Sequence, residues 1–234
     1  MIVEWVIEGD FAHFSHPATI YSSLTYPVPP KTAVMGMVAA IAGIDEPARL
    51  VDMEVAVGIE SLSGKRRFSF NGVKEALSVL DPKKWLECKS GIKERKQFYR
   101  ELLVAPRYRI FCDLGALKER DRIVGAMERG RSYYPLYLGI NLCLGSYELI
   151  EVHGRAESVE ERRLEFDTMV PLDYPFLLEP GKQYTDVRMA TRVDGERHFG
   201  GFRDYLVELG GKRITCEGER VRGVRIGERV VAWA

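Results

Sequence analysis

The stretch Thr25–Gly43, TYPVPPKTAVMGMVAAIAG, decides the fold because it sets a stiff segment directly before a helix. Pro29 and Pro30 fix their own φ angles and push the residues before them into extended geometry. Tyr26–Pro30 is therefore predicted to be a rigid strut. We expect this strut to set the preceding loop firmly beside the rest of the fold.

The helix after the strut is predicted over Thr32–Ala42, where the residues are apolar or small. Thr32 is the expected N-cap and Gly43 the expected C-cap. We expect Gly36 and the small residues after it to let the helix pack closely on a sheet. The N-terminus of a helix also presents free backbone N–H groups, which attract phosphate. A tight loop that only feeds a core helix is the alternative.

The composition indicates a globular protein of one large domain or two small ones. The 234 residues are 46% hydrophobic and 29% charged, and 34 lysines and arginines balance 34 aspartates and glutamates. The longest apolar run, Thr32–Ile44, has 13 residues and is too short to cross a bilayer. The cysteines lack metal-ligand spacing and are expected to be reduced, packed thiols of a cytoplasmic protein: Cys88, Cys112, Cys143 and Cys216.

The charge is uneven along the chain, although the total is neutral. From Ser63 to Arg109 there are thirteen basic and five acidic residues, a local excess of eight positive charges. The same segment also holds several aromatic residues: Phe68, Phe70, Trp85, Phe98 and Tyr99. A mixture of cations and aromatics is typical of a groove for single-stranded nucleic acid. An ordinary solvated surface is the alternative.

The order of the predicted elements defines the fold class. Strands are predicted over Ile2–Ile7, Met53–Leu62, Arg100–Leu114 (interrupted at Pro106) and Tyr133–Gly145, with a second helix over Gly115–Gly130. This β-α-β-β-α-β order is that of a ferredoxin-like α+β domain, with an antiparallel sheet and two helices on one face. We expect a first domain over residues 1–153, with an inserted hairpin at about 63–101, and a β-rich C-terminal subdomain over 154–234. Ser146–His153 is predicted to add a short strand.

No cofactor and no metal site are expected, because the sequence lacks the motifs of phosphate loops, dinucleotide folds and metalloproteases. His13 and His16 stand three residues apart, but a structural or surface role is favoured for both. A turn or surface position is expected for His153 and His198. In HFGGFRDY, residues 198–205, the aromatic rings could stack on a base, and a β-bulge or a hairpin turn is the simpler interpretation.

Four segments, in order, resemble the signatures of the Cas five family of CRISPR-associated proteins. They are VEWVIEGDFAHFSHP, TYPVPPKTAVMGMVAAIAG, RELLVAPRYRIF and YYPLYLGINLCLG. The matches run over Ile2–Gly145, about three-fifths of the chain, and the second is the most specific. The resemblance implies a ferredoxin-like, RNA-recognition-type domain of the repeat-associated superfamily. It also implies that the inserted hairpin, the thumb of this family, lies between the second and third strands.

The resemblance further implies a subunit of a type I CRISPR effector complex (Cascade) in antiviral defence. Such a subunit binds the 5′ handle of the guide crRNA and caps the complex. The implied partners are the backbone subunit and the large subunit, with target DNA contacted only indirectly and no membrane. Because the handle is single-stranded, base stacking and phosphate contacts can hold it, while guide pairing reads the target.

The expected RNA-binding residues lie in the strut, the insertion and the later strands. They are Tyr26, Lys31, Lys65, Arg66, Arg67, Lys93, Arg95, Lys96, Arg107, Arg109 and Arg203. Tyr26, Lys31 and the N-terminus of the first helix are expected to meet the handle together. The strut and the basic hairpin are expected on the same side of the molecule, since one RNA strand has to touch both.

Two alternatives stay open. The first is a metal-independent endoribonuclease that cuts the repeat RNA, with Tyr26, Lys31 and either His13 or His16 as its catalytic residues. One branch of the family cuts RNA with a tyrosine, a lysine and an adjacent histidine, but no Lys-His dipeptide occurs here, so a non-catalytic role is favoured. The second alternative is a structural subunit whose basic segment contacts protein or target DNA.

Overall fold

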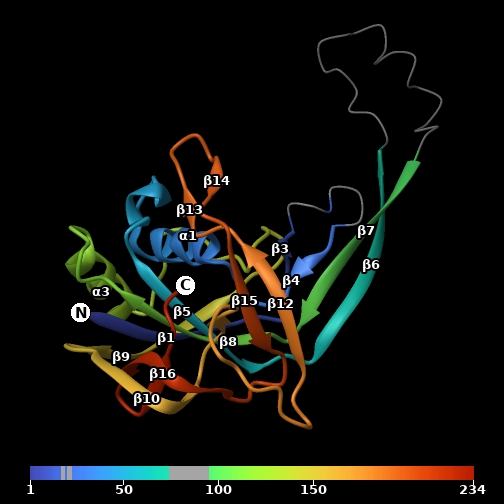
Figure 1. The fold of residues 1–234 in the computed structure, drawn as a ribbon. Helices are drawn as coiled ribbons and strands as arrows, with labels where there is room; N and C mark the ends of the chain where they lie inside the picture. The colour runs from blue at the N-terminus through green and yellow to red at the C-terminus, as the bar shows by residue number, and fades with distance from the viewer. Residues whose placement is uncertain (17–18, 20–22, 74–94) are drawn as a thin grey trace, which may run out of the picture.

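The computed structural model describes residues 1–16, 19, 23–73 and 95–234, and its centre is a four-stranded antiparallel sheet (Figure 1). The strand order is β5-β8-β1-β9. The bounds are Glu54–Ser61 for β5, Arg107–Asp113 for β8, Ile2–Glu8 for β1 and Ser146–His153 for β9. Helix α1 (Lys31–Ala42) connects β1 to β5, followed by the short 3-10 helix η1 (Pro47–Leu50), and α3 (Arg120–Glu128) connects β8 to β9.

The two faces of this sheet belong to different cores, because alternate strand residues point to opposite sides. Val3, Trp5 and Ile7 of β1 belong to the main core, which also contains the buried side of α1. Ile2 belongs to a smaller core that includes Ile226 and other C-terminal residues. The helices therefore cover one face of the sheet, and C-terminal strands cover part of the other.

Helix α1 corrects two predictions and confirms a third. Its N-cap is Pro30, with φ −64° and ψ 156° and no side-chain cap, so the predicted N-cap at Thr32 is wrong. The fixed φ of proline already suits the extended geometry of an N-cap. Gly43 is the C-cap in the left-handed conformation, with φ 69°, as predicted. Gly36 does not face the sheet, since a Cβ atom built there would meet nothing within 4 Å.

The first two predicted strands are confirmed, the third is interrupted at Pro106 as predicted, and the fourth is wrong. The third divides where Ala105 takes a φ of 46° just before Pro106, which separates β7 (Arg95–Val104) from β8. The segment predicted as the fourth strand, 133–145, forms only an isolated bridge, and β9 takes the place at the sheet edge. Gly139 in that segment passes so close to the backbone of His13 that a Cβ would lie 2.0 Å from its carbonyl oxygen. The second helix, predicted over Gly115–Gly130, is present as the shorter helix α3 (Arg120–Glu128).

Residues after 153 are rich in β-structure, as predicted. The strands form a β10-β16-β17 sheet (Glu157–Phe166, Ile214–Ile226, Arg229–Val231), a β11-β15-β12 sheet (Val170–Pro171, Arg203–Glu208, Tyr184–Met189) and a β13-β14 hairpin (Arg192–Val193, Phe199–Gly200). Val187 and Tyr205 join the main core, while Ile226 joins the smaller one. This segment thus packs against both faces of the first sheet, and the division into two domains at residue 153 stays a prediction.

Two further expectations concern the cysteines and the membrane. The described cysteines, Cys112, Cys143 and Cys216, are buried free thiols, as predicted, and Cys88 lies outside the described residues. In the described part of the chain, no helix has both the length and the apolar character needed to span a membrane.

Candidate nucleic-acid interface

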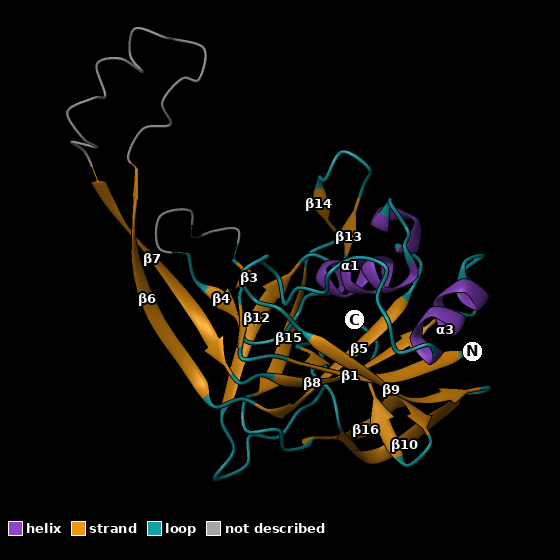
Figure 2. Ribbon diagram, turned by 180° about the vertical axis from the view of Figure 1, so that it is seen from behind, coloured by secondary structure: helices purple, strands orange, loops and turns teal. Residues whose placement is uncertain are grey.

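The basic insertion forms a two-stranded arm, which we define as residues 64–73 and 95–104. Its strands β6 (Gly64–Val73) and β7 pair antiparallel along their whole length. Figures 1 and 2 show the arm projecting from the body of the molecule. This confirms the predicted hairpin for the described residues. Residues 74–94, with Trp85 and Lys93, lie outside them, and of Arg95 and Lys96 only the backbone is described.

One face of the arm combines aromatic and basic side chains. The strand register places Phe68 opposite Arg100 and Phe70 opposite Phe98, with Arg66 two residues before Phe68 on the same face. The rings of Phe70 and Phe98 stack with centroids 5.5 Å apart, and the Arg100 guanidinium lies 5.7 Å from the Phe70 centroid. Phe68 and Phe70 are 40% and 46% exposed. In the sequence, the residues of this face stand at every second position of each strand. A count of charges alone does not reveal this alternation.

The base of the arm is attached to the loop that leads into the strut. The short strand β2 (Phe11–Ala12) pairs with β7, and β3 (Phe14–Ser15) pairs with β4 (Thr25–Tyr26). The Thr25 backbone N–H donates to the Glu101 carboxylate at 3.1 Å, and Lys65 Nζ lies 3.5 Å from the same oxygen. The expectation that the strut and the arm lie on one side of the molecule is confirmed.

Tyr26 and Lys31 lie inside the fold rather than on its surface. Tyr26 is 4% exposed, its hydroxyl donates to the Arg188 carbonyl at 2.6 Å, and burial raises its pKa. Lys31 is 7% exposed, with Nζ 3.8 Å from a Glu54 carboxylate oxygen. As folded, the Tyr26 ring is not a stacking surface, and the two side chains take different partners.

His13 is a buried structural histidine. Its Nδ1 lies 2.7 Å from the Glu101 carbonyl oxygen, and its Nε2 lies 3.1 Å from Ser23 Oγ. Because a carbonyl only accepts, Nδ1 carries the proton, and the neutral ring accepts at Nε2 from the Ser23 hydroxyl. Burial lowers the pKa of His13, which favours this neutral form. The ring therefore joins the first loop to the arm.

Of the residues of the endoribonuclease alternative, His16 and Tyr26 lie together, whereas His13 and Lys31 take other partners. His16 lies against Tyr26, with ring centroids 4.7 Å apart. His13 is bonded to the arm, and Lys31 is turned to Glu54. A cleaving site would need a base and a cation at the same phosphate.

Arg107 and Arg109 are engaged in ion pairs on the sheet face opposite the helices. Arg107 Nε donates to Glu60 at 2.7 Å, and Nη1 of Arg107 bonds Glu8. Arg109 bonds both Glu60 and Glu4. Burial acts to raise the pKa of Glu60, but its bonds to the two guanidinium groups lower the pKa overall. Sequence reasoning did not find these acidic partners, because they come from other strands.

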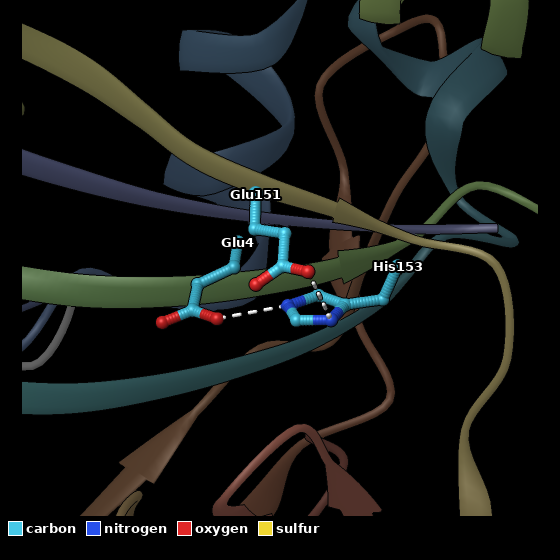
Figure 3. Close-up of side chains that lie close together, drawn as sticks. All are labelled: Glu4, Glu151 and His153. Carbon is cyan, nitrogen blue, oxygen red and sulfur yellow. Dashed lines mark hydrogen bonds and ion pairs between the residues drawn. The ribbon is translucent and has the colours of Figure 1, made fainter.

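The same face carries a cluster of Glu4, Glu151 and His153, in which Glu4 is buried and Glu151 is exposed (Figure 3). His153 Nε2 lies 2.9 Å from Glu4 Oε2, and its Nδ1 lies 3.7 Å from Glu151. His153 is 9% exposed, so the expected turn or surface position is wrong. Among the described residues these three could bring ligand atoms within 4.8 Å of one another. However, Arg109 and Arg229 already neutralise Glu4, so the cluster fits an ion-pair network better than a divalent metal.

The HFGGFRDY segment contains β14, which is one strand of the β13-β14 hairpin, and the start of β15, whereas the hairpin turn itself lies at residues 194–198. Phe199 and Phe202 are 57% and 46% exposed and line a 120 Å³ pocket together with Tyr26. Arg203 and Lys31 line a neighbouring cavity of 730 Å³. Arg203 also lies 3.7 Å from Asp173. Tertiary structure thus joins two motifs that are far apart in the sequence.

This sheet-rich α+β chain with a projecting basic arm matches a known family of CRISPR proteins. The family model described as CRISPR-associated protein (Cas_Cas5) matches residues 2–203. Because the match covers most of the chain, the chain belongs to the Cas5 family, which the sequence segments resemble. Among curated proteins there is no sequence match.

Solved structures with a similar fold include other CRISPR proteins. One belongs to a CRISPR RNA-guided surveillance complex, with 14% identity and a TM-score of 0.53 over 91% of this chain and 90% of that chain. A CRISPR protein from Archaeoglobus fulgidus has 14% identity and a TM-score of 0.54, over 99% and 98% of the two chains. A chain of Type III-B Cmr-beta bound to cognate target RNA and AMPPnP has 9% identity and a TM-score of 0.52, over 91% and 86%. At these identities the likeness establishes the fold.

Proposed function

We propose that the chain holds the 5′ handle of the guide crRNA and caps the effector complex as a non-catalytic subunit. Membership of the Cas5 family makes it a subunit of a CRISPR effector complex. The observation that carries the RNA-binding proposal is the arm face with Phe70, Phe98 and Arg100, anchored beside the strut. A single strand lying on this face would find stacking surfaces and cations together.

Arg100 is the central cation in this proposal. Its Nε is buried, and in the described part of the chain it has no hydrogen-bond partner. A phosphate oxygen would bond the other N–H donors of this guanidinium, which carries five in all. The guanidinium already lies over Phe70, so that a base on the ring and its own phosphate would both contact the arm. Arg66, on the same face, would contact a neighbouring phosphate.

We infer that the four-stranded sheet and its two helices form a ferredoxin-like, RNA-recognition-type domain. The antiparallel order β5-β8-β1-β9, with α1 after the first strand and α3 after the third, supports this. The expected partners remain the backbone and large subunits, with target DNA contacted indirectly, in the cytoplasm. The neutral total charge is compatible with this role, because RNA needs only one basic face.

The proposal is tested by substituting the two stacked rings of the arm. We expect Phe70→Ala and Phe98→Ala each to weaken binding of a labelled handle RNA by about 1–3 kcal/mol, the range for one stacked base. Affinity is measured by gel shift over a series of salt concentrations. A steep loss of affinity with salt is expected, because phosphate contacts release counterions.

Tyr99→Ala is the matched control, since Tyr99 is 48% exposed and lies on the other face of the same strand. Equal losses for Tyr99→Ala and Phe98→Ala would contradict the assignment of the binding face. Incubation of the pure protein with repeat RNA and EDTA tests the enzyme alternative, and specific cleavage would contradict a non-catalytic role.

A further inference from the structure

The outward face of α1 lacks the charged residues that a surface helix usually carries. After Lys31 the helix reads TAVMGMVAAIA, with no charge on any side. A helix that is apolar all round is normally buried all round. Yet Thr32, Ala33, Gly36 and Ala40 remain partly exposed. Part of this helix is therefore built to be covered by something other than its own chain.

Two cavities flank this face of α1. One of 440 Å³ lies toward η1 and the β13-β14 hairpin and is lined by Pro47, Val193 and Phe199. Another of 240 Å³ lies on the other side and is lined by Pro135, Leu136 and Tyr137. Gly36 lines both cavities, and we call the two cavities together the α1 groove. Figures 1 and 2 show the β13-β14 hairpin rising beside α1, and Val193 and Phe199 of this hairpin line the larger cavity.

The rim of the groove is acidic. The larger cavity is lined by Asp45, Glu46 and Asp194, and by one cation, Arg197. Asp45 accepts a hydrogen bond from Tyr134, and Asp194 pairs with His198. Glu46 is exposed and has no ion pair among the described residues. Such a rim repels phosphate and attracts lysine or arginine.

We propose that the α1 groove docks a protein segment of another effector-complex subunit, with apolar side chains on the floor and lysine or arginine at the rim. An apolar floor with a polar rim is the usual anatomy of a protein interface. RNA is a less favourable occupant, because three carboxylates line the larger cavity and would repel its phosphates. The inference goes beyond handle binding and rests on the chain's place in an effector complex.

Gly36→Leu tests the groove directly. Since a Cβ at this position meets nothing within 4 Å, the leucine fills the groove without disturbing the chain's own core. We expect co-purification with the other tagged subunits of the reconstituted complex to fall about tenfold. Glu46→Lys should lower it in the same direction by repelling the basic rim of the partner. Handle-RNA affinity of the isolated variant should stay within about twofold of wild type, because the arm is unchanged.

Gly125→Leu in α3 is the matched control, because it is also a helical glycine, and its Cβ would meet only the end of the Arg129 side chain at 3.6 Å. Unchanged assembly of Gly36→Leu overturns the proposal. Loss of handle-RNA affinity in Gly36→Leu identifies the groove as an RNA surface and also overturns it. If the isolated protein is a dimer and Gly36→Leu dissociates it, the groove binds a second copy of this chain. That outcome also overturns the proposal. Failure of the handle proposal is separate, because it is measured with Phe70→Ala and Phe98→Ala.

Discussion

At the scale of single residues, burial decides which of the expected RNA-binding side chains can contact RNA. Tyr26 and Lys31 stand in a segment that reads as a surface loop, yet both are less than a tenth exposed. Their polar ends take partners from distant segments, the Arg188 carbonyl and the Glu54 carboxylate. Phe70 and Arg100, in contrast, remain available on the arm. Residue type alone cannot separate these two situations, because the partners come from elsewhere in the chain.

Tyr26→Phe separates the structural role of this tyrosine from a role in RNA binding. Removing the hydroxyl leaves the Arg188 carbonyl without its donor, and we expect the free energy of unfolding to fall by about 1–2 kcal/mol. Handle-RNA affinity should not change. Urea denaturation and gel shift measure the two quantities. Tyr133→Phe is the control, since Tyr133 is 72% exposed and should leave the stability unchanged. A loss of RNA affinity in Tyr26→Phe without a loss of stability would restore Tyr26 as a contact residue.

At the scale of elements, the junction between the first loop and the arm organises the candidate interface. Strand β2 pairs with β7, and the Glu101 residue of β7 receives bonds from the loop through both backbone and side chain. The hairpin was predictable, because alternation along a strand acts locally. Its attachment to the first loop was not, because it depends on long-range pairing.

The His13 junction makes the stability of the protein depend on pH. Because burial lowers the pKa of His13 in the folded state, the unfolded chain takes up the proton first, at its ordinary value of about 6.5. The contribution is complete above that pH and is lost as the pH falls through about 6.5 toward the lower folded pKa. We expect the free energy of unfolding to decline over this range with a slope of at most about 1.4 kcal/mol per pH unit from this group.

Urea denaturation at several pH values, on wild type and His13→Asn, measures this dependence. The variant should show a flatter decline, because it lacks the titrating ring. His198→Gln is the control, since His198 is 72% exposed and should leave the slope unchanged. Identical slopes for wild type and His13→Asn would contradict the assignment.

At the scale of the whole molecule, an ion-pair network joins the first sheet to the C-terminal strands. Glu4 of β1 meets Arg109 of β8 and His153 of β9, and it lies 3.8 Å from Arg229 of β17. Arg229 also meets Asp167, at 3.2 Å. The network lies beside the small core of Ile2 and Ile226. Segments from both ends of the chain are thus held together by charge and by apolar contact.

Glu4→Gln tests how much this network contributes to the free energy of unfolding. The substitution removes one of the two carboxylates that pair with Arg109 and leaves Glu60 as the other, so we expect the free energy of unfolding to fall by about 1–3 kcal/mol. Glu157→Gln on β10 is the control, since that side chain is exposed, and its effect should stay within about 0.5 kcal/mol. Chemical denaturation measures both. A loss below about 1 kcal/mol for Glu4→Gln would show that the apolar core alone joins the two parts.

The sequence by itself determined the elements whose signals are local: α1 with its Gly43 cap, the first two strands, the basic hairpin and the family. The tertiary structure decided what depends on distant partners. It replaced the predicted fourth strand at 133–145 with β9, which pairs with β1 at the sheet edge. It buried Tyr26, Lys31 and His153, and it turned Gly36 outward onto a groove. Burial and ion pairing are properties of residues brought together across the chain, so no local pattern could specify them.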